Sequence, residues 1–130
     1  MLFRLSYIVA LSLIILSLSV AAYTIDTNSD ENGNSYLTNQ DGRTLYYFTN
    51  DPSGKSTCFG NCCETWPPFY ADWIDLPPIL NRADFSYLSR ADGRYQTTYK
   101  GKPLYFYSSD KSRGERYGDG KQGLWFVARP

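Results

Sequence analysis

The sequence predicts an all-β domain, a small sandwich or a partly closed barrel, built from a duplicated strand–turn–strand unit and carrying a long Cys/Pro-rich loop. The duplication is visible in two phrases, LYYFTNDPSG at residues 45–54 and LYFYSSDKSRG at residues 104–114. In an extended chain each phrase points apolar side chains to both faces, which is typical of strands covered on both sides. The twelve tyrosines suit half-buried strands, because each has an apolar ring and a polar hydroxyl.

Residues 1–22 have the composition of a secretory signal peptide. One charge, Arg4, precedes an apolar run from Leu5 to Val20 and then small residues that fit a cleavage site. The alternative is an uncleaved N-terminal anchor, because residues 5–22 fall only just short of the ~20 residues that span a bilayer. We expect cleavage after Ala22, since the run contains four serines and no basic stop-transfer cluster follows it. Contact with a membrane is expected only through residues 5–22, if they are retained.

The remainder of the chain predicts a short tether and one domain. Residues 23–34, YTIDTNSDENGN, are polar and predict a flexible tether. Residues 35–130 then form a single all-β domain with two related halves, 35–54 and 86–114. The chain has 13 basic and 13 acidic residues, so it lacks the positive charge that would hold nucleic acid or anionic membranes.

The repeat also predicts the individual strands. SYLTNQDGR at 35–43 matches SYLSRADGR at 86–94, and Asp41-Gly42 and Asp92-Gly93 are dipeptides that two-residue hairpins favour. The segment YQTTYKGK, at 95–102, has no counterpart in this alignment and predicts one extra strand and turn in the second half. With a closing strand in GLWFVARP, we expect six or seven short strands.

The segment between the two halves predicts a long ordered loop. Residues 58–80, CFGNCCETWPPFYADWIDLPPIL, contain four prolines and no clean periodicity. The pairs Pro67-Pro68 and Pro77-Pro78 exclude a regular helix through this region. One short helical turn is the most regular structure expected there.

A short motif, Tyr-x-(Phe/Trp/Tyr)-x-x-Asp, occurs once in each half, and other motifs accompany it in order: DGRTLY, CFGNC followed by WPP, GKPLYFY and GLWFV. Together, over residues 35–128, they resemble the secreted repeat of unknown function, a family often labelled as predicted lipoproteins. The resemblance implies an exported all-β domain of the microbial envelope with no assigned activity. This chain lacks the lipid-bearing cysteine, and Cys63 stands where a small residue is expected. The motif residues are Tyr46, Phe48, Asp51, Tyr105, Tyr107 and Asp110.

The two motif aspartates have two possible roles. Asp51 and Asp110 each lie three residues past the second aromatic of the motif, where an Asx-turn would end a strand. We favour this turn-capping role over a ligand-binding carboxylate.

The composition excludes several chemistries. The sequence contains no histidine, which rules out Ser-His-Asp and Cys-His catalysis and Cys-x-x-Cys-His haem attachment. We expect no enzymatic activity, no cofactor and no metal site. A hydrolase that works through carboxylates has no positive support in the sequence.

Two functional hypotheses therefore remain. The first is a secreted or envelope module that binds a protein, a polymer or a small ligand through exposed aromatics such as Trp66 and Trp73. The alternative is an extracellular thiol–disulfide or electron-transfer protein centred on Cys58, Cys62 and Cys63, against which we weigh a purely structural disulfide.

Three cysteines allow three disulfide pairings. A bond between Cys62 and Cys63 is the least favourable, because vicinal cysteines close a strained ring. Gly60 and Asn61 supply the tight turn that a Cys58–Cys62 bond needs, although spacing alone leaves Cys58–Cys63 open. The family resemblance also points to Cys58 and Cys62. We therefore predict that Cys63 remains a free thiol.

Overall fold

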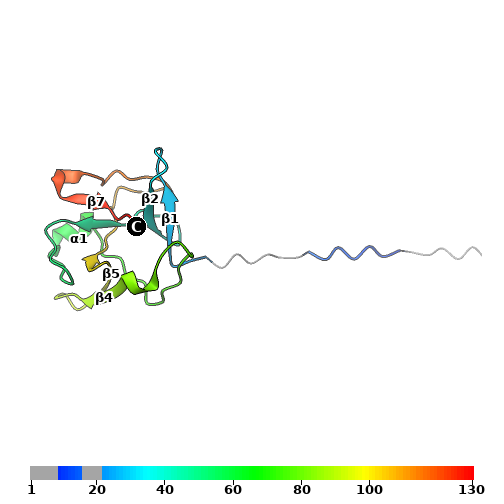
Figure 1. Ribbon diagram of the computed structural model, residues 1–130, viewed down its shortest axis with the longest axis horizontal. Coiled ribbons are helices and arrows are strands. Elements are labelled where there is room, and N and C mark those ends of the chain that lie inside the picture. The colour runs from blue at the N-terminus through cyan, green and yellow to red at the C-terminus, as the bar shows by residue number, and fades with distance from the viewer. Residues whose placement is uncertain (1–8, 16–21) are drawn as a thin grey trace, which may run out of the picture.

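The computed structural model describes residues 9–15 and 22–130. Residues 9–15 lie outside the folded domain and contain no helix or strand (Figure 1). Much of the predicted signal peptide or anchor, at 1–8 and 16–21, lies outside the described residues, so its cleavage stays a prediction. Over the described ranges, no helix has the length and apolar character needed to cross a membrane.

Short antiparallel strands dominate the domain, which confirms the all-β class. They form three small sheets, ordered β1-β2, β3-β7 and β4-β5-β6, and over residues 22–130 these sheets do not close into a barrel. The strands are β1 (Ile25–Ser29), β2 (Ser35–Asn39), β3 (Tyr46–Phe48), β4 (Phe85–Ser89), β5 (Tyr95–Tyr99), β6 (Lys102–Pro103) and β7 (Trp125–Val127). Three short helical turns complete the fold: α1 (Asn61–Thr65), η1 (Arg82–Asp84) and η2 (Lys121–Gly123).

The predicted tether at 23–34 instead contains the first strand and the turn of a β-hairpin, and this prediction was wrong. Strand β1 pairs with β2 along its whole length, from Ile25 opposite Asn39 to Ser29 opposite Ser35. The side chain of Ile25 is fully buried. The polar residues that suggested disorder form the turn, where Asp30 Oδ1 accepts the N–H groups of residues 32 and 34.

The hairpin corrects the alignment of the two halves. Strands β1 and β2, at 25–29 and 35–39, correspond to β4 and β5, at 85–89 and 95–99, a shift of 60 residues. SYLTN, at 35–39, is therefore β2, the second strand of the first hairpin. SYLS, at 86–89, lies in β4, the first strand of the second hairpin. The segment YQTTYKGK is not an addition to the second half, because β5 is the counterpart of β2.

The Asp-Gly turns are consequently not equivalent to each other. Both lie in hairpin turns as predicted, but each loop has three residues, closed by the Asn39–Arg43 and Arg90–Arg94 backbone bonds. Gly42 and Gly93 have φ angles of 80° and 86°, which the last loop position requires. By its place in the fold Gly93 corresponds to Gly33, while Gly42 corresponds to Gly101.

An approximate twofold relation joins the two halves. At its centre Tyr46 and Tyr105 exchange backbone hydrogen bonds, with N···O distances of 2.8 and 2.9 Å. Residues 65–70, in the Cys/Pro-rich loop, bond to the strands of the second half. Residues 124–129 bond to the strands of the first half in the equivalent way. Equivalent backbone hydrogen bonds show this relation. The N–H of Leu37 donates to the carbonyl of Ala128, and the N–H of Thr97 donates to that of Phe69. In the same way Thr49 donates to Leu124, and Ser108 donates to Thr65.

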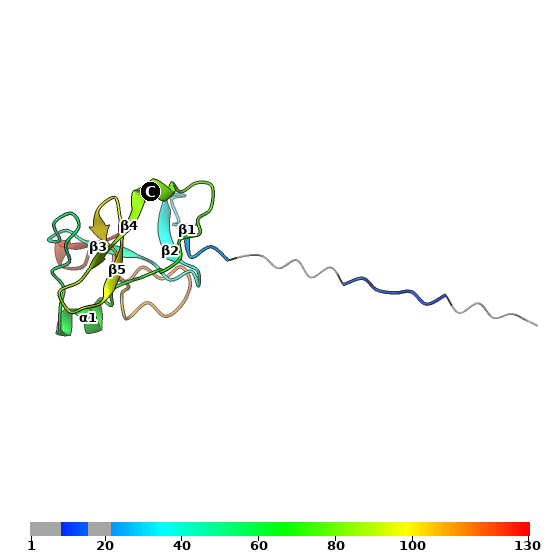
Figure 2. The ribbon, with the colours of Figure 1, turned by 90° about the horizontal axis from the view of Figure 1, so that it is seen from below.

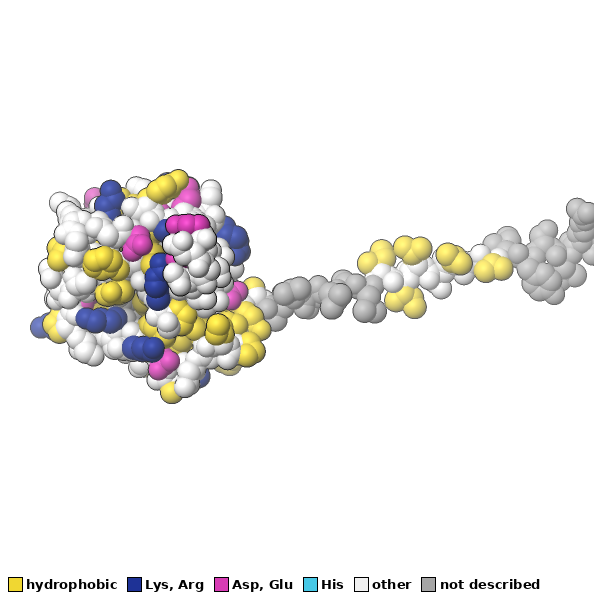
Figure 3. All heavy atoms as spheres, turned by 45° about the horizontal axis from the view of Figure 1, so that its top comes forward, with side chains coloured by type: hydrophobic (Ala, Val, Ile, Leu, Met, Phe, Trp, Pro, Cys, Tyr) yellow, Lys and Arg dark blue, Asp and Glu magenta, His cyan; other side chains and the backbone are white. Residues whose placement is uncertain are grey.

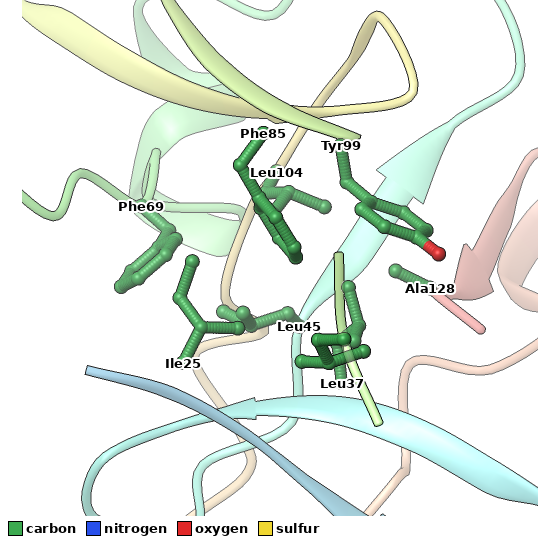
Figure 4. Close-up of a cluster of buried hydrophobic side chains, with 9 residues drawn as sticks. Ile25, Leu37, Leu45, Phe69, Phe85, Tyr99, Leu104 and Ala128 are labelled. Atoms are coloured by element: carbon green, nitrogen blue, oxygen red, sulfur yellow. The ribbon is translucent and has the colours of Figure 1, made fainter. Parts of the chain in front are cut away.

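The core contains side chains from both halves. One cluster is mainly aliphatic and includes the corresponding leucines Leu45 and Leu104, both fully buried (Figure 4). A second cluster is mainly aromatic and surrounds Tyr46 and Tyr105. The β1–β2 hairpin lies on the side where the N-terminal segment joins the domain, and α1 lies on the other side (Figures 1 and 2).

Truncation of Ile25 tests whether β1 belongs to the folded domain. We expect Ile25→Ala to lower the free energy of unfolding by about 2–5 kcal/mol, because it removes methyl groups from a close-packed core. Ile79→Ala is the matched control, since Ile79 is 64% exposed and should change stability by no more than about 0.5 kcal/mol. Urea denaturation of the two variants measures both. Equal stability of the two would contradict the assignment of β1 to the core.

Candidate functional site

The repeated motif forms two crossed hydrogen bonds at the centre of the domain. The hydroxyl of Tyr46 donates to Asp110 Oδ2 at 2.5 Å, and the hydroxyl of Tyr105 donates to Asp51 Oδ2 at 2.7 Å. The tyrosine of each half therefore binds the aspartate of the other half. All four side chains are buried.

The same aspartates cap turns in their own halves. Asp51 Oδ1 accepts the backbone N–H and the hydroxyl of Thr57, and Asp110 Oδ1 accepts the backbone N–H of Tyr117. Their exposed fractions are only 2% and 3%, which leaves little access for an external ligand. These contacts agree with the turn-capping role and not with a ligand-binding carboxylate.

Burial also sets the protonation of this network. It raises the pKa of Tyr46 and of Tyr105 above the ordinary value for tyrosine, and the neighbouring carboxylates act in the same direction. Both hydroxyls therefore stay protonated and serve as donors. Burial likewise raises the pKa of Asp110, against the opposing effect of its hydrogen bond from Tyr46.

The remaining motif residues, Phe48 and Tyr107, are partly buried and pack against the aromatic cluster. Trp66 and Trp125, which correspond under the twofold relation, stack with ring centroids 3.9 Å apart and an interplanar angle of 1°. Phe48 stacks on Trp125 at 4.2 Å, and Tyr107 lies against Trp66 at 4.5 Å. A side chain at Gly118 would collide with this stack, because an added Cβ would lie 2.7 Å from Trp66.

Trp66 is therefore not an exposed binding residue, and that prediction was wrong. It is 6% exposed because it is the counterpart of Trp125, whose place in the closing strand faces the core. Trp73, in contrast, is 74% exposed. The repeated motif is a structural signature, and surface binding has to be sought elsewhere.

A pocket with aromatic walls lies beside Trp73. Its cavity volume is about 280 Å³, and it is lined by the rings of Phe69, Tyr70, Trp73 and Phe106 together with polar side chains that include Gln40 and Asp72. Among the described residues that line this aromatic pocket, none is lysine or arginine. It thus combines flat apolar faces with neutral and acidic hydrogen-bonding groups.

Three tyrosines extend the aromatic pocket across the neighbouring sheet. Tyr70, Tyr87 and Tyr95 contact one another, with ring centroids 5.5 to 6.3 Å apart, and each is at least 41% exposed. We call these residues with Trp73 the aromatic surface. Figure 3 shows hydrophobic side chains gathered on the domain near the point where the N-terminal segment leaves it, and Thr24, close to that segment, lines the aromatic pocket.

Sequence reasoning identified Trp73 but not the three tyrosines. Tyr87 lies in the middle of β4 and Tyr95 at the start of β5, and both rings are more than half exposed. Serines flank Tyr87 in SYLS, and this polar context was the one signal of an exposed ring. Their contact with Tyr70 depends on the path of the long loop, which the sequence pattern does not specify.

The cysteines form a second group of reactive residues. Cys58 and Cys62 are joined by a disulfide, the pairing that the sequence favoured, with Cα atoms 5.4 Å apart, and Cys63 is a partly buried free thiol in α1. The fully buried guanidinium of Arg90 donates from Nη2 to the carbonyl of Cys58 at 2.7 Å and contacts Cys63 Sγ at 3.2 Å. No sequence signal indicated a buried arginine here, because RADGR has the composition of an exposed turn.

Arg90 has further partners that hold it in place. Its guanidinium donates to Ser56 and Gln96, and it pairs with Asp92 at 3.0 Å. Hydrogen bonds from Arg94 and Arg90 hold the pKa of Asp92 well below its usual range. In the part of the chain that the structure describes, no three acidic, cysteine or histidine side chains are grouped to hold a metal ion.

Comparison with known families agrees with this two-part architecture. The family model for the secreted repeat of unknown function matches residues 26–70 and 86–129, together more than half of the chain. The chain belongs to this family. The first match begins inside β1 and the second inside β4, so the two matches coincide with the structural halves. No curated protein and no solved structure matches the chain.

Removal of either motif hydroxyl should destabilise the domain, with Tyr46 the more sensitive. Tyr46→Phe deprives Asp110 of one of its two donors, and we expect a loss of about 1–3 kcal/mol in the free energy of unfolding. Tyr105→Phe should cost less, because Asp51 keeps both donors from Thr57. Tyr87→Phe, at a tyrosine 62% exposed, is the control in urea denaturation. If both core variants match this control, the crossed bonds do not stabilise the fold.

Proposed function

We propose that this protein is an exported, non-enzymatic module of the cell envelope or cell surface that binds a neutral glycan polymer through the aromatic surface. The observation that carries the proposal is the set of exposed rings, Tyr70, Trp73, Tyr87 and Tyr95, that continue from the walls of the aromatic pocket. Large exposed apolar patches on a protein surface mark interaction sites or ligand-binding grooves. The absence of histidine from the sequence supports a role without catalysis.

The chemistry of the aromatic surface favours a sugar polymer over a protein or a small ligand. Sugar rings present C–H groups that pack on the electron-rich faces of aromatic rings, and their hydroxyls bond to amides and carboxylates. Gln40 and Asp72 supply such groups beside the rings of the aromatic pocket. The lack of cationic side chains among its described lining residues disfavours phosphate- or carboxylate-rich polymers.

The length of the surface also supports a polymer. The aromatic pocket is smaller than the ~300–1,000 Å³ typical of sites that enclose a drug-sized ligand. Tyr70 belongs both to this pocket and to the tyrosine contacts over the β4–β5 hairpin. A chain of sugars would use the pocket and the open surface at the same time. The secreted character of the family supports an encounter with such polymers outside the cytoplasm.

Affinity electrophoresis in gels that contain soluble neutral polysaccharides, together with pull-down on insoluble chitin and cellulose, tests the proposal. We expect retardation on at least one neutral glycan, weakened about tenfold by Trp73→Ala or Tyr95→Ala, since loss of an aromatic anchor costs more than ~1 kcal/mol. Tyr117→Ala is the matched control, because Tyr117 is 61% exposed but lies outside the aromatic surface. No retained glycan, or equal losses in all three variants, would refute the proposal.

A second candidate function is thiol–disulfide exchange at Cys63. Its support is the contact between Arg90 and the free thiol, since a neighbouring cation is common to reactive cysteines. In this reaction the Cys63 sulfur attacks a disulfide of a partner, forms a new S–S bond with one partner sulfur and releases the other as a thiolate. The Cys58–Cys62 disulfide orders the adjacent loop.

Oxidised glutathione provides the test of this second candidate. We expect the folded protein to gain one glutathionyl group, located on Cys63 by peptide mapping, and Cys63→Ser to gain none. A tag on Cys58 or Cys62 in non-reduced protein would contradict the disulfide assignment. A folded protein that stays unmodified would leave the cysteines with a structural role alone.

A further inference from the structure

The twofold relation places a second pocket at the position equivalent to the aromatic pocket. This pocket has a cavity volume of about 240 Å³. Five of its lining positions have a counterpart in the lining of the aromatic pocket. Tyr47 corresponds to Phe106, Tyr99 to Asn39, Lys100 to Gln40, Ala128 to Phe69 and Arg129 to Tyr70. Positions 99 and 100 differ from their counterparts by 60 residues, as β5 does from β2, and positions 47, 128 and 129 differ by 59, as Tyr46 does from Tyr105. The duplication of the fold has therefore produced a pair of equivalent hollows.

The side chains at these equivalent positions differ in chemistry. Gln40 of the aromatic pocket is replaced by Lys100, Tyr70 by Arg129, and Phe69 by the smaller Ala128. Lys102 adds a third cation, and among the described residues that line this basic pocket none is acidic. The change from aromatic and acidic groups to cations alters the kind of ligand that the hollow can accept.

The walls of the basic pocket are apolar behind its charged groups. They consist of Leu104, Ala128 and the rings of Tyr47 and Tyr99. Figure 4 shows the Tyr99 ring beside Ala128 at the margin of the core. A ligand with an apolar body would bury that body here and leave a polar head among the cations.

Two of the three cations already have partners in the chain. Arg129 pairs with Asp30 at 3.1 Å, and Lys102 Nζ donates to the backbone carbonyl of Asp51 at 3.2 Å. Lys100 lies with its Nζ 5.2 Å from the centroid of the Tyr99 ring and is exposed. Lys100 is thus the cation best placed to meet a ligand. Lys102, whose partner is a neutral carbonyl, adds to the positive potential, whereas Asp30 offsets the charge of Arg129.

We propose that the basic pocket binds a small amphipathic carboxylate, an aliphatic or aromatic body with one anionic head, in contact with Lys100. The proposal is independent of glycan binding, because the two pockets share no lining residue. At about 240 Å³ the hollow suits a free molecule smaller than a drug-sized ligand. The exposed cation of Lys100 would pair with the anionic head, and the apolar walls of the pocket would contact the apolar body of the ligand.

Octanoate is the probe for this site, and octan-1-ol is its uncharged counterpart. Titration of the folded domain, followed by amide chemical shifts, should show octanoate perturbing residues 99–104 and 128–129. We expect octanoate to bind at least fivefold more tightly than octan-1-ol, and Lys100→Gln to remove most of this difference. Lys100→Gln is a mild change, because it keeps a long polar side chain at this exposed position and removes its charge.

Three further variants separate the possible outcomes. Ala128→Val should weaken both probes by reducing the hollow, whereas Lys55→Gln and Trp73→Ala, outside the basic pocket, should leave octanoate binding unchanged. Equal affinity for the two probes, or an unchanged affinity in Lys100→Gln, would overturn the proposal. It would also be overturned if octanoate did not bind but vesicles of phosphatidylglycerol bound in a Lys100-dependent manner, since the cations would then serve a membrane surface.

Discussion

The crossed hydrogen bonds between Tyr46 and Asp110, and between Tyr105 and Asp51, are the constraint on which this fold depends. Each buried carboxylate has one oxygen that its own half satisfies and one that only the tyrosine of the other half satisfies. Loss of that tyrosine would cost about 1–3 kcal/mol, so each half stabilises the buried aspartate of the other. Each aspartate also fixes a turn in its own half through a backbone N–H. The association of the halves and the local shape of each half are therefore stabilised by the same four side chains.

Periodicity and turn chemistry were enough to predict the all-β class, the duplication and the closing strand. They did not reveal β1, because its polar sequence IDTNS buries mainly Ile25 and owes its extended shape to pairing with β2. Once β1 was missed, β5 was counted as an addition, and the chance likeness of SYLTN and SYLS gave the wrong alignment. A single unrecognised strand thus produced both errors.

The candidate sites were harder to predict than the fold, for a physical reason. Whether an aromatic residue is buried depends on contacts with distant segments, and Trp66 and Trp73 lie in the same loop with opposite environments. The aromatic surface combines residues of this loop with residues of the β4–β5 hairpin. The pair of equivalent pockets likewise becomes visible only when the correct shift between the halves is known.

The stacking of Trp66 on Trp125 bears on the origin of the molecule. The two rings lie on opposite sides of the twofold relation, so a single half, standing alone, would present one indole, one tyrosine and one aspartate without their partners. A second copy of that half would supply all three in the same geometry. The packing is therefore that of two copies of one self-pairing unit, half the present size, joined in a single chain. Two separate copies would have identical hollows, whereas within one chain the two hollows differ, and one carries cations where the other carries rings.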